Sequence, residues 1–568
     1  MAASASLAIG GPALLAFNFP PSATFLNQAA ALVGWGSFLV VLGIFALPRR
    51  LTLPPSGLTA ALAALGLLVA SALASPAWAG LPWSLALSGV GMLVAALLVM
   101  AVGATAQSVG WAHRAFQAFC IGLVFAGVLS SLIGIVQVFA PQWPDGDWIA
   151  KTYIPGRAVG NMRQPNHLSG LLVWAFIAAA WLGETGGIRR WASAALAMLF
   201  VFVIVLTASR TGTLSIGLMV VWALFDRRLS RQTRILLACA PLAYGVFWLG
   251  MSAWADYSSH LFGGETRFST KGDISSSRWA IWSNTLALIR MHPWAGVGFG
   301  EFNFAWTLTP FPGRPVAFFD HTHNLVLQLA VELGVPLAAL VLALLGWALW
   351  RAWRDAQDSL RRAALVMVLM VLLHSLLEYP LWYAYFLLPA AFAFGLCLGR
   401  QNDEAVIAAP APSVARATRP LLIASMLLML GGLLSVLDYA RVVVIFAPGE
   451  GAAPLAQRIE SGQHSVFFAH QADYAAATTA EKPADALAAF RRAPHNLLDA
   501  RLMIAWAKAL EESGDTERAR TIAQRLKEFH NDAAAEFFAP CDDAPSDDEP
   551  LPFQCKLPTR PLGYEDFR

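Results

Sequence analysis

Long apolar stretches separated by short polar segments run through most of this chain of 568 residues. A membrane-spanning helix needs roughly 20 apolar residues, and about thirteen stretches reach or approach that length. The predicted spans lie near residues 2–17, 25–46, 56–74, 82–103, 114–140, 168–184, 191–207, 212–226, 234–254, 323–350, 363–378, 380–399 and 420–437. The pattern therefore predicts an all-α, polytopic membrane protein.

The composition supports this class and excludes two others. Hydrophobic residues make up 57% of the chain and charged residues only 13%, which is not the composition of a soluble protein. The net charge of +3 is small, and the arginines are spread over many loops instead of forming a basic stripe. A nucleic-acid partner is therefore not expected.

Basic residues occur in alternate loops between the predicted spans. They are Arg49, Arg50, Arg114, Arg189, Arg190, Arg227, Arg228, Arg231, Arg234, Arg351, Arg354, Arg361, Arg362, Arg400, Arg416 and Arg419. By the positive-inside rule these loops are cytoplasmic, so the N-terminus is predicted inside and the C-terminus outside the membrane. Loop 141–167, the Ala208–Thr211 hairpin, loop 255–322 and the tail then share the periplasmic side.

The chain changes character at Asp438, which divides it into two predicted domains. Residues 1–437 form a transmembrane catalytic domain that includes periplasmic loop 255–322, and residues 438–568 form a small periplasmic helical domain. In the second domain, apolar residues at helical spacing on both sides of Gly514-Asp515 indicate two helices joined by a turn. This pair resembles a tetratricopeptide-type repeat, although a compact helical cap is favoured over a repeat array.

Two of the five cysteines fall near each other in the tail. Cys541 and Cys555 bracket an acidic, proline-containing segment, whereas the other three lie in apolar helices. The tail pair is the only disulfide candidate, and it requires an oxidising compartment such as the periplasm.

Arg210 interrupts a long apolar run at the tight polar turn Ser209-Arg210-Thr211-Gly212. Each flanking half has roughly 15 residues and spans about 22 Å, less than the roughly 30 Å hydrocarbon core. The hairpin should therefore dip below the headgroups, where an arginine is costly unless it faces a polar cavity or an anion. The alternative is an arginine that extends to lipid phosphates.

Two more arginines are candidates for binding an anion or lining the substrate site. Arg278 comes after Ser275-Ser276-Ser277 at the start of an amphipathic helix, an arrangement that can hold an anion. A solvated arginine on an interfacial helix explains it equally well. Arg163 belongs to a polar cluster that ends loop 141–167 immediately before a membrane helix, together with Gln164, Asn166 and His167. Capping of that helix needs only Asn166, so the density of polar groups favours a substrate-lining role.

His321-Thr322-His323-Asn324 lies where the large loop meets an apolar helix. His323 is the candidate general base, because imidazole titrates near neutrality and can accept a proton from a hydroxyl nucleophile. His321 points to another face, and Asp320 could orient one of the two rings. A His-x-His metal site is disfavoured because no third ligand lies at helical spacing, so neither metal nor cofactor is predicted.

Glu378 and Tyr379 stand at the outer end of the next helix, as candidates for supporting the site or binding the acceptor; a helix-ending turn is the simpler reading. Together, three arginines, an imidazole and amides without a carboxylate cluster suit a reaction with a diphosphate leaving group and a hydroxyl nucleophile.

Six sequence elements resemble those of the bacterial protein O-oligosaccharyltransferases of the PglL type, within the superfamily of O-antigen ligases and Wzy polymerases. The resemblance is strongest over residues 150–400. Its elements are Gln164-Pro165-Asn166-His167, Ser209-Arg210-Thr211, Arg278 with Trp282, His292-Pro293 with Gly296-Val297-Gly298, His321-Thr322-His323-Asn324 and Leu377-Glu378-Tyr379-Pro380-Leu381-Trp382.

This resemblance implies en bloc transfer of a glycan from undecaprenyl diphosphate to an acceptor hydroxyl on the periplasmic side. Arg210 and Arg278, joined by Arg163, would bind the diphosphate, and His323 would deprotonate the acceptor. Gln164, Asn166, His167, His321, Asn324, Glu378 and Tyr379 would line the substrates. The extra span and periplasmic tail favour a pilin-like protein acceptor. Lipid A-core ligation or repeat-unit polymerisation is the alternative, and a transporter is disfavoured because neither internal repeats nor midplane charge pairs are evident.

Overall fold

The computed structural model describes residues 1–45, 54–108, 110–258, 260–265, 274–312, 314–400, 414–541 and 551–568. Within these ranges the chain forms helices and turns but no strand, so the predicted all-helical class is confirmed. Arg49 and Arg50, and the side chains of Ser275–Ser277, Arg416 and Arg419, lie outside the described residues.

Each predicted span overlaps a helix. Nine helices in the described part of the chain are long and apolar enough to cross a membrane, and three further apolar helices are shorter. The helices that overlap the predicted spans, apart from one described in the next paragraph, are α1 (Ala2–Leu14), α2 (Phe25–Phe45), α3 (Ser56–Trp78), α4 (Trp83–Ser108), α5 (Ala112–Phe139), α6 (Pro165–Glu184), α7 (Arg190–Thr207), α8 (Arg210–Phe225), α9 (Arg231–Ser258), α14 (Val335–Asp355), α15 (Ser359–Ser375), α16 (Ala384–Leu398) and α17 (Val414–Phe446). The number of spans, about thirteen, stays a prediction.

The span predicted over 323–350 is wrong as one continuous helix. Gly334, with φ 74°, separates α13 (Leu325–Leu333) from α14. A Cβ at Gly334 would lie 2.3 Å from the Trp294 carbonyl oxygen, and the Val335 N–H donates to Pro293 O over 2.7 Å. The close approach of the 292–298 loop therefore breaks the helix at a residue that only glycine can occupy.

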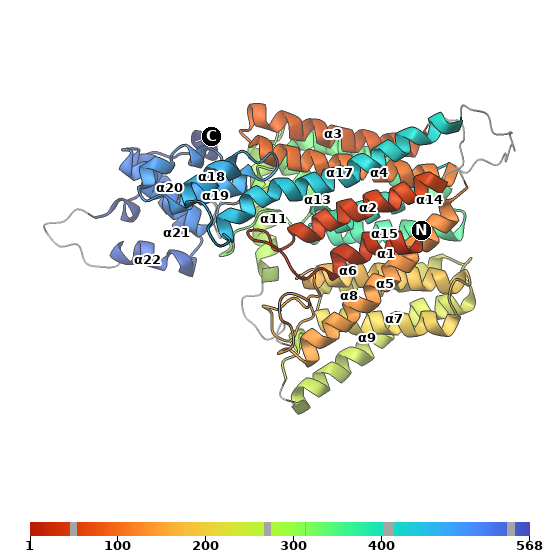
Figure 1. Cartoon of the computed structure of the whole chain (residues 1–568). Helices are drawn as coiled ribbons and strands as arrows, with labels where there is room; N and C mark the ends of the chain where they lie inside the picture. The colour runs from red at the N-terminus through yellow and green to blue at the C-terminus, as the bar shows by residue number, and fades with distance from the viewer. Residues whose placement is uncertain are drawn as a thin grey trace. The chain divides into compact units, whose positions relative to one another are not determined.

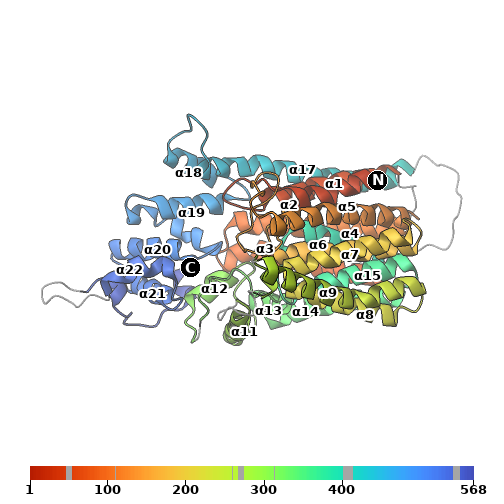
Figure 2. The same ribbon diagram turned by 90° about the horizontal axis from the view of Figure 1, so that it is seen from below.

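The chain divides into two compact units, and the first comprises 1–65, 92–271 and 343–436. Its centre is α6, the most deeply buried of the candidate spans. Helices α5, α7 and α15 pack around it and run alongside it in Figures 1 and 2. Small residues allow this approach: a Cβ at Gly127 on α5 would lie 2.6 Å from the Ala175 methyl group on α6.

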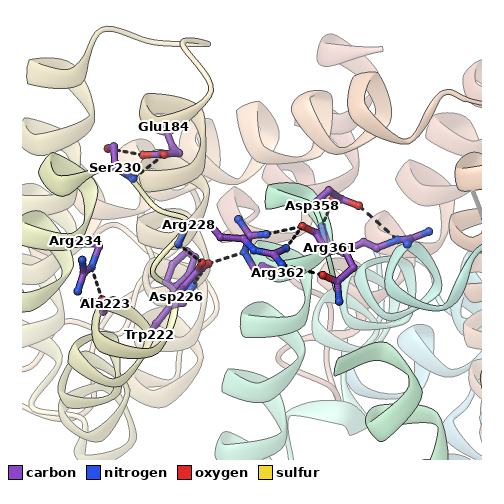
Figure 3. Close-up of polar contacts among 11 residues, drawn as sticks. Glu184, Trp222, Ala223, Asp226, Arg228, Ser230, Arg234, Asp358, Arg361 and Arg362 are labelled. Carbon is purple, nitrogen blue, oxygen red and sulfur yellow. Dashed lines mark hydrogen bonds and ion pairs between the residues drawn. The ribbon is translucent and has the colours of Figure 1, made fainter. Parts of the chain in front are cut away.

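The arginine-rich ends of this unit are held by paired polar groups (Figure 3). Arg362 contacts Asp226 over 2.7 Å, and Arg361 donates to Gly399 O over 2.7 Å. Glu184 accepts hydrogen bonds from the backbone N–H and the hydroxyl of Ser230, over 2.9 and 2.7 Å. These contacts join the α8–α9 loop to the start of α15 and to the end of α6, which fixes the helix ends opposite the α7–α8 turn.

The second unit comprises 66–91, 272–342 and 437–568. The tail predicted to be a separate domain thus shares its core with the large loop. Further helices of this unit are α11 (Ile274–Met291), α12 (Phe302–Leu308), α13, α18 (Leu455–Gln463), α19 (Ala469–Thr479), α20 (Ala500–Glu512), α21 (Thr516–Lys527) and α22 (Ala535–Phe538). Short 3-10 turns span Pro380–Trp382 in the first unit and Pro483–Ala486, Ala489–Arg491, Ala493–His495, Asp532–Ala534, Ala539–Cys541, Phe553–Cys555 and Tyr564–Phe567 in the second.

Helix α12 is the centre of the second unit, and all seven of its residues are buried. Trp306 packs against Phe529, and Phe304 stacks on the His495 ring at 4.5 Å. His495 in turn contacts Glu301 over 2.9 Å with both groups buried. The tail therefore folds around the loop helix instead of beside it.

Two predictions for the tail can be checked directly. Helices α20 and α21 pack together across Gly514-Asp515, as predicted, and the Asp515 side chain caps α21. The segment before them forms 3-10 turns instead of a regular helix, and Pro494 removes a backbone donor within it. Cys541 and Cys555 form the predicted disulfide.

Candidate active site

The first group of candidate residues, within the first unit, joins the starts of α6 and α8 to the segment after α15. Asn166 donates to Glu378 Oε1 over 2.9 Å and accepts from the Ser209 hydroxyl over 2.6 Å. Ser209 is the N-cap of α8, where its oxygen accepts from Gly212 N. A chain of hydrogen bonds therefore runs from the Glu378 carboxylate to the cap of the helix that begins with Arg210.

Arg210 is exposed at the first position of α8. Ala208, the C-cap of α7 two positions before Arg210, has φ 48°, so the chain reverses sharply between α7 and α8. With 16 residues, α8 is about 24 Å long and shorter than a bilayer core, which agrees with the short-hairpin interpretation. The arginine thus stands at the tip of a tight turn whose backbone is fixed by Ser209.

The four polar candidate residues at the start of α6 make different contacts from one another. Gln164, not Asn166, is the N-cap of α6 and accepts from His167 N over 2.7 Å. One Nη of Arg163 donates to Ala16 O over 2.5 Å. His167 is buried and lies among aromatic rings, with Nδ1 3.1 Å from the Tyr385 hydroxyl. Of these four side chains, Asn166 is the one connected to the Arg210 turn.

The second group, within the second unit, surrounds His323. The side chain of Asn324 caps α13 by accepting from Val326 N and Leu327 N, so His323 precedes the helix immediately. Asp320 contacts His321 over 3.1 Å, which answers which of the two rings it orients. Burial tends to raise the pKa of Asp320, but the neighbouring His321 overrides it and holds that pKa below its ordinary value.

The backbone of Thr322, next to His323, is held by hydrogen bonds at both its N–H and its carbonyl group. Gln328 Oε1 accepts from Thr322 N over 2.8 Å, and Trp282 Nε1 donates to Thr322 O over 2.9 Å. Arg278 is four residues before Trp282 on α11, so the two share a face of that helix. The contact of Trp282 with Thr322 therefore places Arg278 on the α11 face directed to the histidine segment.

Left-handed backbone conformations coincide with the candidate site. Four described residues other than glycine have positive φ, and three of them are Arg163 (59°), Ala208 (48°) and His323 (54°). Such conformations cost roughly 1–3 kcal/mol each and persist only where surrounding contacts impose them. Since strain of this kind gathers at functional sites, it supports the choice of these segments independently of any sequence motif.

Gln328 is a residue that the sequence reasoning did not single out. Gln328 donates to Glu332 Oε1 over 2.9 Å while it holds Thr322, and Glu332 is buried one turn further along α13. Burial raises the pKa of Glu332 to about 7. The signal was available, because two polar residues four apart in an apolar helix share one face.

Family comparisons cover all candidate residues. The chain matches the family described as O-antigen ligase over residues 194–342, which include Arg210, Arg278 and His323. It matches the protein glycosylation ligase family over 158–182, which include Arg163 and Asn166. A third match, to the C-terminal part of a virulence factor membrane-bound polymerase family, spans 362–540.

Two curated relatives come from Acinetobacter baylyi. Its general O-oligosaccharyltransferase is 27% identical over 307 residues, 51% of this chain and 52% of the relative. The predicted resemblance to PglL-type protein O-oligosaccharyltransferases is confirmed. A ComP-specific O-oligosaccharyltransferase is 24% identical over 251 residues, 42% of this chain and 44% of the relative. The chain thus matches about half the length of each of these O-oligosaccharyltransferases.

Proposed function

We propose that this protein transfers a preassembled glycan en bloc from undecaprenyl diphosphate to Ser or Thr hydroxyls of exported, pilin-like proteins. The observation that carries the proposal is that the O-antigen ligase match and the protein glycosylation ligase match together contain Arg163, Asn166, Arg210, Arg278 and His323. Both relatives are named as O-oligosaccharyltransferases, and one is named as specific for ComP.

The chemistry assigned to these residues is a single displacement. The acceptor oxygen attacks the anomeric carbon of the first sugar while its proton passes to His323. The bond from that carbon to the phosphate oxygen breaks, and undecaprenyl diphosphate leaves. Arg210 and Arg278, with Arg163, neutralise the charge that develops on the diphosphate. No cofactor takes part in this scheme.

The membrane setting of the proposal follows the arginine distribution. The arginine-rich ends would face the cytoplasm, and the α7–α8 turn, the His323 segment and the tail would face the periplasm of a bacterial inner membrane. A lipid-linked donor in the outer leaflet would then reach the arginines from the bilayer.

The experiment uses purified full-length protein in lipid nanodiscs with fluorescent undecaprenyl-diphosphate oligosaccharide. Three parallel reactions contain a pilin acceptor, lipid A-core or no acceptor. We expect labelled pilin, and loss of that product by at least about a hundredfold in His323→Ala.

A second candidate function comes from the polymerase family match over 362–540. Label on lipid A-core would instead identify a ligase. Longer lipid-linked glycans in the reaction without acceptor would identify a polymerase.

A further inference from the structure

A groove of about 650 Å³ lies within the second unit, between the first turn of α4 and the α18–α19 pair. Its walls combine an exposed indole with polar side chains. Trp83 is 59% exposed on one wall, and Gln463, Ser465 and Asp473 are among the residues of the other. This volume falls in the range of small-ligand sites.

The groove is anchored by hydrogen bonds on both sides. Ser88 on α4 donates to Phe467 O over 2.9 Å, and Ser84 lies 3.4 Å from His470. Across the groove, the buried Asp473 carboxylate accepts from Gln463 over 2.9 Å. The walls are therefore held in place by the protein's own contacts.

The charges of the lining argue against an anionic ligand. Arg492 is already engaged with Asp473 through two hydrogen bonds, of 2.8 and 2.7 Å. Glu460, the remaining carboxylate, is exposed on the rim. A diphosphate would meet no uncommitted arginine among these lining residues. The groove therefore differs from the segments that carry Arg210 and Arg278, the candidates for binding the diphosphate.

The shape and composition also argue against a peptide. Addition of a strand needs a sheet edge, and the groove is built from helices and the turn between them. A docked amphipathic helix needs a continuous apolar stripe. Here the apolar side chains Trp83 and Leu87 belong to the α4 wall, while the α18–α19 wall carries Gln463, Ser465 and Asp473 beside Val466.

A sugar chain fits this lining. The face of a pyranose ring is made of C–H groups that pack against an indole. Its hydroxyls can pair with the exposed Glu460 carboxylate and the Gln463 amide oxygen, whereas the buried Asp473 carboxylate is already held by Gln463 and Arg492. Trp83 is also the first residue of a candidate membrane span, so the groove opens at the end of that span. A glycan tethered through diphosphate to a membrane lipid is held at the same level.

We propose that this groove binds the sugars of the donor glycan that lie beyond the first sugar, whose anomeric carbon reacts. The inference rests on the proposed function and adds a determinant of glycan length to it. Trp83 provides the stacking platform, and the groove raises the affinity for long donors without contributing to bond cleavage.

The test compares two donors, undecaprenyl diphosphate carrying a single sugar and the same lipid carrying an oligosaccharide. We expect Trp83→Ala to raise KM for the oligosaccharide donor about tenfold and to change KM for the single-sugar donor by less than about twofold. Trp83→Phe should restore most of the affinity. Trp191→Ala is the matched control, because Trp191 is 69% exposed at the start of α7.

A second variant protects the test against misfolding. Val466 is 50% exposed, so Val466→Trp adds bulk to the groove at little cost in stability and should give the same length-dependent loss. Equal effects on both donors, no effect, or a raised KM for the acceptor alone would each overturn the proposal. If wild-type protein transfers neither glycan, the proposed function itself has failed.

Discussion

The Ser209 hydroxyl donates a hydrogen bond to the Asn166 side-chain oxygen over 2.6 Å, although the two residues are 43 positions apart. The same hydroxyl caps α8 through Gly212 N, and Asn166 is held by Glu378. Because Ser209 directly precedes Arg210, this bond determines where the turn that carries the arginine lies. We therefore propose that Asn166 acts as a positioning residue for Arg210.

The first prediction is that Asn166 and Ser209 act as a unit. Asn166→Ala and Ser209→Ala should each reduce kcat/KM for the donor about tenfold or more, and the double variant should be little worse than either. Residues in one network typically couple by 0.5–3 kcal/mol, so roughly this much non-additivity is expected. Donor titrations of the four proteins measure it, with acceptor KM as the readout that should not change.

Ser71→Ala is the control for loss of a hydroxyl in a membrane helix, because its hydroxyl donates to Leu67 O within the same helix. Its kinetics should match wild type. Additive losses in the double variant would show that Asn166 and Ser209 act separately.

The sequence predicted the local setting of the candidate residues better than the contacts between them. Arg210 in its polar turn and His323 before a helix were both predicted because polar residues interrupt apolar runs. The contact of Asn166 with Ser209 could not be predicted, since it depends on how α6 packs against α8. The assignment of Asn166 as the alternative cap of α6 was wrong for the same reason: Gln164 takes that role and leaves Asn166 for the tertiary contact.

The domain boundary shows a similar limit. Hydropathy separates the polar tail at Asp438 from the spans, but it carries no information about which polar segment the tail folds around. The buried Glu301–His495 pair joins residues 194 positions apart. The helix break at Gly334 also arises from a distant segment, the loop at Pro293 and Trp294. Both features are imposed by packing that local patterns do not encode.

The second prediction distinguishes the catalytic role of the His323 imidazole from the strain of its backbone conformation. Its φ of 54° is unfavourable for alanine but accessible to glycine and relatively well tolerated by asparagine. His323→Ala, His323→Gly and His323→Asn should all lose transfer activity by at least about a hundredfold. Only His323→Ala should also lower the unfolding temperature, since it adds strain of about 1 kcal/mol.

Transfer assays and thermal unfolding in the same nanodiscs separate these effects. Substantial activity in His323→Asn would show that the imidazole is not the base. Equal unfolding temperatures for the alanine and glycine variants would show that the backbone conformation is not strained.

The third prediction concerns Glu332. Burial raises the pKa of Glu332 to about 7 from its ordinary 4.5. The folded state is therefore favoured most below pH about 4.5, and this advantage is lost as the pH rises to about 7. The shift corresponds to roughly 3 kcal/mol. Glu332→Gln keeps the shape and an acceptor for Gln328 without the charge, so it should be more stable than wild type above pH 7.

Unfolding temperatures between pH 4.5 and 8 measure this difference, and Glu536→Gln, at an exposed glutamate of α22, is the control. The gap between wild type and Glu332→Gln should widen as the pH increases. A constant gap would mean that Glu332 ionises in the folded protein as it does in water.

The last prediction tests how the tail is attached to the large loop. Arg314 is 8% exposed, and its guanidinium lies 4.6 Å from the centre of the Phe529 ring and 3.3 Å from Glu528. It also donates to Trp306 O over 2.9 Å. Burial lowers its pKa only to about 10, so the group stays charged at neutral pH. Arg314→Ala removes the stacking and leaves Glu528 without this partner, which should cost about 3 kcal/mol.

The comparison variants distinguish geometry from charge. Arg314→Lys keeps the charge but loses the planar group that stacks and donates in several directions, so it should recover less than half of the stability. Arg518→Ala breaks an exposed pair with Asp515, where both side chains are more than a third exposed, and should cost less than about 1 kcal/mol. Denaturant unfolding followed by tryptophan fluorescence measures all three. A lysine variant as stable as wild type would show that charge alone holds the tail to the loop, because lysine cannot reproduce the stacking on Phe529.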